Sequence, residues 1–226
     1  MSGLGVFDII GPIMVGPSSS HTAGAARLAK VARAIAGCEV KEVTFLLHGS
    51  FGKTYKGHGT DRALVAGILG MDPSDDGLRD SLESAKEKGV NIIFKEEDLG
   101  DYHPNTVKFL IKCVNNKTCE VVGSSIGGGN IEIVEISGSK VHFTGTYDTI
   151  ITTHKDIPGT VAKVTSILYS NRINIAFMNL ERKQKGKIAT MTFEVDSKVH
   201  KDLIEKIEMV EGIEKVILIE RVEDGE

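Results

Sequence analysis

The C-terminal third of the chain alternates short hydrophobic patterns of two kinds. Apolar residues at every second position predict strands near 149–153, 173–177, 189–195 and 213–219. Apolar residues three or four positions apart predict one helix after residue 160 and another over about 199–210. The resulting order is βαββαβ, the ferredoxin-like arrangement. We therefore expect a separate small domain over residues 147–226.

The first two-thirds of the chain is less regular and richer in glycine. Apolar residues at helical spacing predict a helix over about 22–36, which Gly37 ends. Further helices are expected at 62–70 and 78–88, and strands near 42–47, 90–95, 106–114, 118–126, 130–136 and 139–144. The adjacent Asn115 and Asn116 lie between two alternating runs and predict a hairpin turn. The fold class is thus α/β (α+β), with the larger domain over residues 1–146.

Composition narrows the classes of function. Hydrophobic residues make up 41% and charged residues 26% of the 226 positions, with a net charge of −4, as in an ordinary globular protein. No basic stripe with interleaved aromatic residues occurs, so we expect no nucleic-acid partner. The apolar N-terminal segment 1–15 is broken by Asp8, Gly11 and Pro12, and no basic residue precedes it. It is therefore interpreted as neither a signal peptide nor a membrane span, and a cytoplasmic location is expected.

The cysteines argue against metal chemistry within this chain. Cys38, Cys113 and Cys119 are an odd number and form no CxxC pair. We expect no disulfide framework and no iron–sulfur or other metal site made by this chain alone. A free cysteine behaves mostly as a small hydrophobic residue, so all three are expected to be buried or incidental.

The first candidate site is the segment GPSSSHTAG at 16–24, which opens the first predicted helix. The free amides and the positive dipole end of a helix start favour an anion, and hydroxyl groups add donors. A helix cap would need only one hydroxyl, whereas this segment offers four together with an imidazole. The pattern predicts an anion site formed by Ser18, Ser19, Ser20, His21 and Thr22.

The second candidate site is HGSFGKTYKGHGTD at 48–61. A nucleotide-binding interpretation fails because the phosphate-binding loop needs a glycine five residues before Gly52, where Leu47 stands. Two later glycines also forbid the helix that would have to follow directly. We expect instead a mobile loop that offers candidate substrate and acid/base groups, of which histidine suits proton transfer near neutral pH. These groups are Lys56, His58, Thr60 and Asp61.

The turn after the first strand of the small domain adds a third motif. The sequence DIPG at 156–159 resembles the ACT domain, a regulatory module that binds amino acids. That resemblance implies a ligand site at the loop and the following helix start, with Asp156, Pro158 and Gly159 as its residues. A simpler interpretation makes Pro158 a first-turn residue and Gly159 a tight turn. Because a small sheet has open edges, we expect it to pair with another ACT domain.

Together, these motifs resemble those of a known family. The segments GPSSSHTAGAARLA and HGSFGKTYKGHGTD, HPNT at 103–106 and the glycines at 127–129 resemble the beta domain of bacterial L-serine dehydratases in order and spacing. Such enzymes remove water from L-serine, and the aminoacrylate formed hydrolyses to pyruvate and ammonia. With the ACT segment, the resemblance covers essentially the whole chain. It implies that His58 is an acid/base or substrate-positioning group and that the serine-rich segment receives the substrate carboxylate, while His21 orients that segment or touches substrate.

One departure from the family implies a partner. The family's catalytic half, whose cysteines hold a [4Fe-4S] cluster, is missing here, and three scattered cysteines cannot replace it. The resemblance implies a separate alpha subunit that carries the cluster, whose open iron position polarises the serine hydroxyl.

Two other functions compete with this interpretation. The beta domain also resembles the allosteric substrate-binding domain of some phosphoglycerate dehydrogenases, so the chain could be a non-catalytic serine sensor. A free-standing anion-binding module without a partner is a third alternative. A histidine flanked by glycines argues against a purely regulatory role, because a sensor needs no exposed proton-transfer group.

Overall fold

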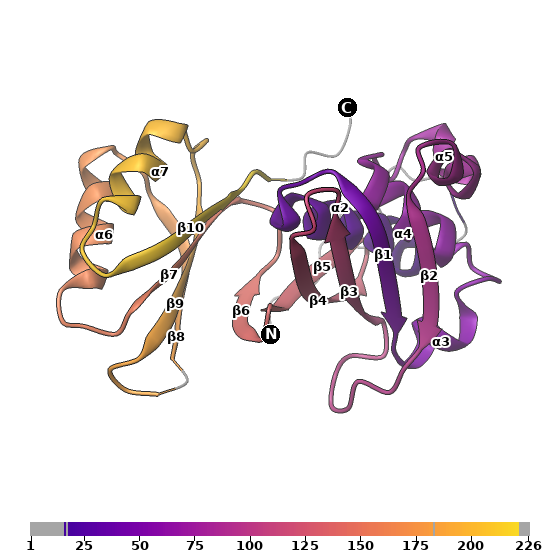
Figure 1. Cartoon of the computed structure of the whole chain (residues 1–226), viewed down its shortest axis with the longest axis horizontal. Helices are drawn as coiled ribbons and strands as arrows, with labels where there is room; N and C mark the ends of the chain where they lie inside the picture. The colour runs from indigo at the N-terminus through magenta and orange to yellow at the C-terminus, as the bar shows by residue number, and fades with distance from the viewer. Residues whose placement is uncertain (1–15, 17, 183, 222–226) are drawn as a thin grey trace. The chain divides into compact units, whose positions relative to one another are not determined.

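The computed structural model describes residue 16 and residues 18–221, except Lys183. These residues form two compact units that divide between Gly138 and Ser139 (Figure 1). No helix in this described part of the chain is long and apolar enough to cross a membrane.

The first unit is built on one mixed sheet with helices beside it. Its elements, in chain order, are the π-helical turn η1 (Ser19–Ala23), α2 (Gly24–Ala36), β1 (Val40–Leu47), α3 (Gly49–Thr54), α4 (Thr60–Leu69), the 3₁₀ helix η2 (Asp76–Asp80), α5 (Ser81–Glu87), β2 (Asn91–Glu96), β3 (Thr106–Cys113), β4 (Thr118–Gly127) and β5 (Asn130–Ile136). Within this unit the strand order is β2-β1-β3-β4-β5, and the next strand, β6 (Ser139–Phe143), belongs to the second unit. The β1 and β2 strands are parallel, and the β1–β3, β3–β4 and β4–β5 pairs are antiparallel.

Helix α2 is held tightly between α4 and the sheet, where it packs on β4 and β5. Its buried face is made largely of alanine, which allows neighbouring backbones to approach closely. Gly67 of α4 lies against the Ala26 carbonyl oxygen, where a Cβ atom would find no room. Close packing therefore fixes the position of α2 and of the serine-rich segment directly before it.

The second unit confirms the expected βαββαβ order. It contains β7 (Asp148–Lys155), α6 (Thr160–Ser170), β8 (Ile175–Arg182), β9 (Ile188–Val195), α7 (Lys201–Glu208) and β10 (Ile213–Ile219). The antiparallel sheet has the order β10-β7-β9-β8, and its core includes Ile150, Val164, Leu168, Met191 and Phe193. The compact unit begins at Ser139, because β6 contacts β8 and β9. The domain boundary expected at residue 147 stays a prediction.

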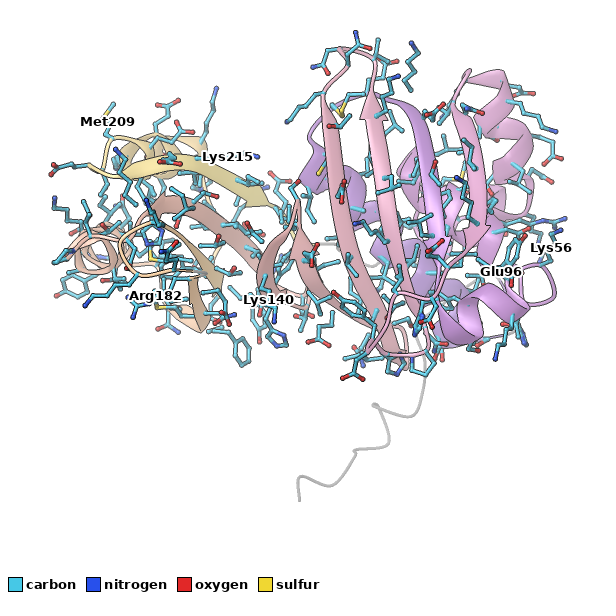
Figure 2. The ribbon with its side chains drawn as sticks, turned by 60° about the horizontal axis from the view of Figure 1, so that its bottom comes forward. Lys56, Glu96, Lys140, Arg182, Met209 and Lys215 are labelled. Carbon is cyan, nitrogen blue, oxygen red and sulfur yellow. A yellow bond between two sulfur atoms is a disulfide. The ribbon has the colours of Figure 1, made fainter. Side chains whose placement is uncertain are left out.

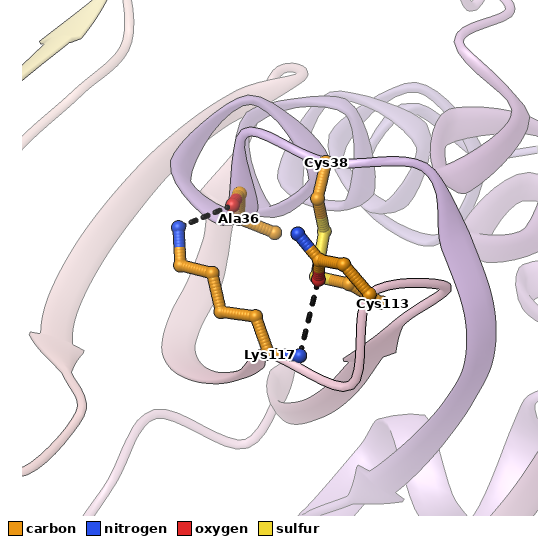
Figure 3. The surroundings of a disulfide bond; sticks show 5 residues. Ala36, Cys38, Cys113 and Lys117 are labelled. Carbon is orange, nitrogen blue, oxygen red and sulfur yellow. Dashed lines mark hydrogen bonds between the residues drawn. A yellow bond between two sulfur atoms is a disulfide. The ribbon is translucent and has the colours of Figure 1, made fainter.

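The expectation that no disulfide forms was wrong. Cys38 and Cys113 form a disulfide that links the segment after α2 to the end of β3 (Figure 3). The antiparallel register of β1 and β3 pairs Val40 with Cys113 and so brings together cysteines 75 residues apart. The Lys117 ammonium reinforces the link by donating to the Ala36 carbonyl oxygen at 3.2 Å. The remaining cysteine, Cys119, is buried as expected.

Part of the expected mobile loop is helical. Residues 49–54 form α3 instead of a glycine-rich loop. From sequence alone, the glycines are expected to break a helix. Contacts from a segment about 50 residues further along the chain fix this turn, as described below.

Candidate functional site

The serine-rich segment, α3 and the turn before α4 meet around the imidazole of His21. Its Nε2 atom lies 3.2 Å from Ser50 Oγ, and its Nδ1 atom lies 3.4 Å from Ser18 Oγ. The ring lies 4.8 Å from the His58 ring and 5.3 Å from the buried Phe51 ring, which it meets edge-on. Two imidazoles and two hydroxyls from three separate segments thus form one polar cluster, which we call the His21 cluster.

The serine-rich segment divides its hydroxyl groups between two roles. Ser18 is the helix cap, because its hydroxyl accepts the His21 amide at 3.3 Å and its carbonyl accepts the Thr22 amide at 2.8 Å. Ser19 and Ser20 are half-buried in the π-helical turn. The Thr22 hydroxyl is buried and has no hydrogen-bond partner among the described residues. The simple capping role therefore accounts for one hydroxyl of the four.

The HPNT motif at 103–106 holds α3 in place. The Pro104 carbonyl oxygen accepts the Ser50 amide at 2.8 Å and the Phe51 amide at 3.4 Å. Gly49 adopts a φ of 56°, and a Cβ atom there would lie 2.7 Å from the Pro104 carbonyl oxygen. These contacts place the Ser50 hydroxyl beside the imidazole. Sequence reasoning missed Ser50, since nothing local distinguishes it from an ordinary loop serine within its motif.

The four candidate groups after α3 separate in the structure. His58 is exposed and reaches the His21 cluster. Lys56 is exposed at the periphery of the first unit, with its ammonium 5.6 Å from the centre of the Tyr55 ring (Figure 2). Thr60 is fully buried at the start of α4. The half-buried Asp61 accepts the amide of the next residue at 2.9 Å, which is a helix-start contact.

The electrostatics of the cluster distinguish its two histidines. Burial lowers the pKa of His21, and the nearby charge of protonated His58 lowers that pKa further. A neutral imidazole offers one donor and one acceptor nitrogen, which suits a ring placed between two hydroxyls. Like charges this close oppose each other, so the pair favours a neutral His21. The arrangement can therefore hold a small polar ligand and transfer a proton.

The donor groups of the described residues do not fit an iron–sulfur cluster. Such clusters are held by cysteine thiolates, but two of the three cysteines are joined in a disulfide and the third is buried. Among the described residues, no group of three or more His, Cys, Asp and Glu side chains could hold a metal ion.

In the candidate site of the second unit, Asp156 forms hydrogen bonds within the protein, whereas Pro158 and Gly159 are exposed. The Asp156 carboxylate accepts from the Gly186 amide at 2.8 Å and from the Arg182 guanidinium at 3.0 Å. These bonds lower the pKa of Asp156, chiefly through Gly186, and fasten its loop to the β8–β9 turn. Pro158 and Gly159 are exposed before α6, and space is open where a Cβ of Gly159 would lie.

Comparison with known proteins agrees with both units. The family model described as serine dehydratase beta chain matches residues 5–87, and the ACT domain model matches residues 147–212. The chain is 46% identical to the L-serine dehydratase beta chain of Peptoniphilus asaccharolyticus over 90% of this chain and 92% of that protein. It is 42% identical to a probable L-serine dehydratase beta chain of Bacillus subtilis, covering 95% and 97% of the two chains. A D-3-phosphoglycerate dehydrogenase of Bacillus subtilis is 28% identical over 80% of this chain but only 34% of that protein.

Proposed function

Since the chain belongs to the serine dehydratase beta chain family, we propose that it is the beta subunit of an L-serine dehydratase, a lyase that converts L-serine to pyruvate and ammonia. The observation that carries this proposal is the His21 cluster, in which His21, His58, Ser18 and Ser50 meet at the start of α2. These residues all fall within the segment that matches the family.

We assign the roles within the cluster from exposure and contacts. His58 is the proton-transfer group, because it is exposed and faces a neutral imidazole. His21 is a positioning residue that joins Ser18 to Ser50. The first amides of η1, which continues directly into α2, and the hydroxyls of Ser19 and Ser20 bind the substrate carboxylate, where the helix dipole favours an anion.

We propose that a separate alpha subunit carries a [4Fe-4S] cluster. Support comes from the beta-chain names of the two most similar relatives described above and from the poor fit of this chain's cysteines to such a cluster. A purely regulatory role has less support, because the dehydrogenase relative is matched over only a third of its length.

The test is pyruvate formation from L-serine by this chain alone and by this chain purified together with an alpha subunit. We expect the lone chain to be iron-free and inactive and the complex to be active. If the alpha subunit alone turned over serine as fast as the complex, with this chain changing only its response to serine, the regulatory function would replace the catalytic one.

We also propose that the second unit pairs with a second copy of itself through the β8 edge. Phe177, Met178 and Leu180 are large apolar residues on this edge strand with 60%, 41% and 47% of their surface exposed. An open apolar edge is normally covered. Leu180→Lys in the full chain should lower the assembly state seen by light scattering. An unchanged assembly state would exclude this edge.

A further inference from the structure

His48 begins the motif at 48–61, but the proposed function does not use its imidazole. His48 lies between β1 and α3, and its side chain is only 14% exposed. Its Nδ1 atom accepts the Leu99 amide at 3.1 Å. Leu99 belongs to the segment between β2 and β3, residues 97–105, which we call the β2–β3 loop. The imidazole therefore joins the start of α3 to a loop about 50 residues further along the chain.

The bond to His48 holds the first half of the β2–β3 loop. The loop begins at Glu97, whose amide donates to the Leu47 carbonyl oxygen at 3.0 Å. Over residues 98–102, the other hydrogen bonds made among the described residues stay within the loop itself. The ring of His48 is therefore the hydrogen-bond partner that ties this stretch, through Leu99, to the rest of the first unit.

The second half of the same loop holds α3. The Pro104 carbonyl oxygen accepts the Ser50 amide at 2.8 Å, and Ser50 is only two residues from His48. The loop is thus attached to one short turn at two points, through Leu99 and through Pro104. Because Ser50 Oγ lies 3.2 Å from Nε2 of His21, a displaced loop would displace a member of the His21 cluster.

The His48 ring acts here as an acceptor and not as a cation. A backbone amide can donate only to an unprotonated ring nitrogen. An ion pair with Asp98 is the alternative, but the Asp98 Oδ1 atom lies 3.6 Å from Nδ1, and its side chain is 89% exposed. That oxygen already accepts the Gly100 amide at 3.0 Å. Since exposed ion pairs contribute little, the bond from Leu99 is the contact that fixes the loop.

We propose that His48 is a positioning residue for the dehydratase reaction, whose unprotonated Nδ1 atom fixes the β2–β3 loop on the start of α3 and so keeps the Ser50 hydroxyl beside the His21 imidazole. The requirement is for an acceptor at this position and not for histidine as such. Asparagine meets it, because its Oδ1 atom is attached to Cγ as Nδ1 is in histidine. This inference rests on the proposed function and adds to it a residue that acts through Ser50.

The experiment measures pyruvate formation from L-serine by the complex of this chain with its alpha subunit. His48→Leu should lower turnover roughly five-fold, the factor that corresponds to one lost neutral hydrogen bond. The KM should not change, because the proposed carboxylate-binding hydroxyls of Ser19 and Ser20 lie on η1. His48→Asn keeps the acceptor and should restore turnover. If the leucine variant does not fold, His48→Gln replaces it, because its oxygen lies one bond further from the backbone.

Two control variants separate positioning from stability and from the ion pair. Asn115 Oδ1 accepts the Lys117 amide at 3.1 Å in the turn beyond the far end of β3. Asn115→Ala thus loses the same kind of bond away from α3, and its thermal midpoint should fall about as far as that of His48→Leu, with normal turnover. Asp98→Asn keeps an acceptor for Gly100 but removes the charge, so turnover should again be normal. A loss of turnover in either control as large as in His48→Leu would overturn the inference.

Hydrogen exchange in the full chain gives a readout that does not depend on activity. The Leu99 amide should exchange roughly five-fold faster or more in His48→Leu than in the wild type, and His48→Asn should restore its protection. Unchanged exchange or turnover in His48→Leu, or no rescue by His48→Asn, would overturn the inference while an active wild-type complex keeps the proposed function. A wild-type complex inactive on L-serine would instead refute the proposed function, and this role of His48 with it.

Discussion

Gly49→Ala should be among the most damaging small substitutions in the first unit. A non-glycine residue at its φ of 56° costs about 1–2 kcal/mol. The added Cβ would lie 2.7 Å from the Pro104 carbonyl oxygen and 2.8 Å from its Cα, and neither backbone atom can move freely. Separating the two segments weakens the bonds from the Ser50 and Phe51 amides, at about 1 kcal/mol for each. The expected loss is about 3–4 kcal/mol of unfolding free energy.

Gly89→Ala is the matched control. Gly89 has a φ of 69°, but no atom lies within 4 Å of its would-be Cβ, so about 1–2 kcal/mol of backbone strain is the whole expected cost. Urea unfolding of both variants measures the difference, and steady-state pyruvate formation in the complex measures its functional effect. Turnover should fall further in Gly49→Ala, because Ser50 leaves the His21 cluster. Equal losses of stability and activity in both variants would refute the role of the Pro104 contact.

Three further predictions concern stability. Reducing the disulfide between Cys38 and Cys113 should lower the unfolding free energy by about 2–4 kcal/mol, and a Cys38→Ser variant should no longer respond to reductant in the same urea experiment. Asp148→Asn should destabilise the second unit by about 2–3 kcal/mol in calorimetry, because this buried carboxylate accepts the Val199 amide at 2.8 Å and the Arg221 amide at 3.0 Å. Burial lowers the pKa of His154, so as the pH falls the unfolded chain protonates this imidazole before the folded chain does. The unfolding free energy should therefore fall as the pH drops below 6.5, and His154→Gln should flatten that dependence.

The second unit was predictable because each of its elements carries its own periodic signal. Alternation marks β9, whose Met191, Phe193 and Val195 lie in the core, and helical spacing marks α6 through Val164 and Leu168. The start of α2 was predictable for a related reason, since a cap residue and a helix start are neighbours in sequence. Local rules therefore sufficed where the deciding contacts are local.

The features that sequence missed depend on contacts between distant segments. Helix α3 exists because Pro104 accepts its first amides, which no glycine-based rule can anticipate. The disulfide depends on the register that pairs Val40 with Cys113. Ser50 carries no local signal, because a serine in a turn is ordinary until its neighbours are known. The Lys56 ammonium lies 5.6 Å from the centre of the Tyr55 ring, and its substrate-binding role stays a prediction.

The most direct test of the proposed catalytic role is the turnover of L-serine by the complex carrying His58→Ala, with iron–sulfur content measured spectroscopically in each preparation. His200→Ala, which removes an exposed histidine from the second unit, is the control. We expect the His58 variant to assemble with its alpha subunit, to keep a full cluster and to lose roughly 100-fold or more in turnover, the range for a positioned proton-transfer group. The control should keep normal turnover. Near-normal turnover of the His58 variant with a full cluster would contradict a catalytic role for this chain.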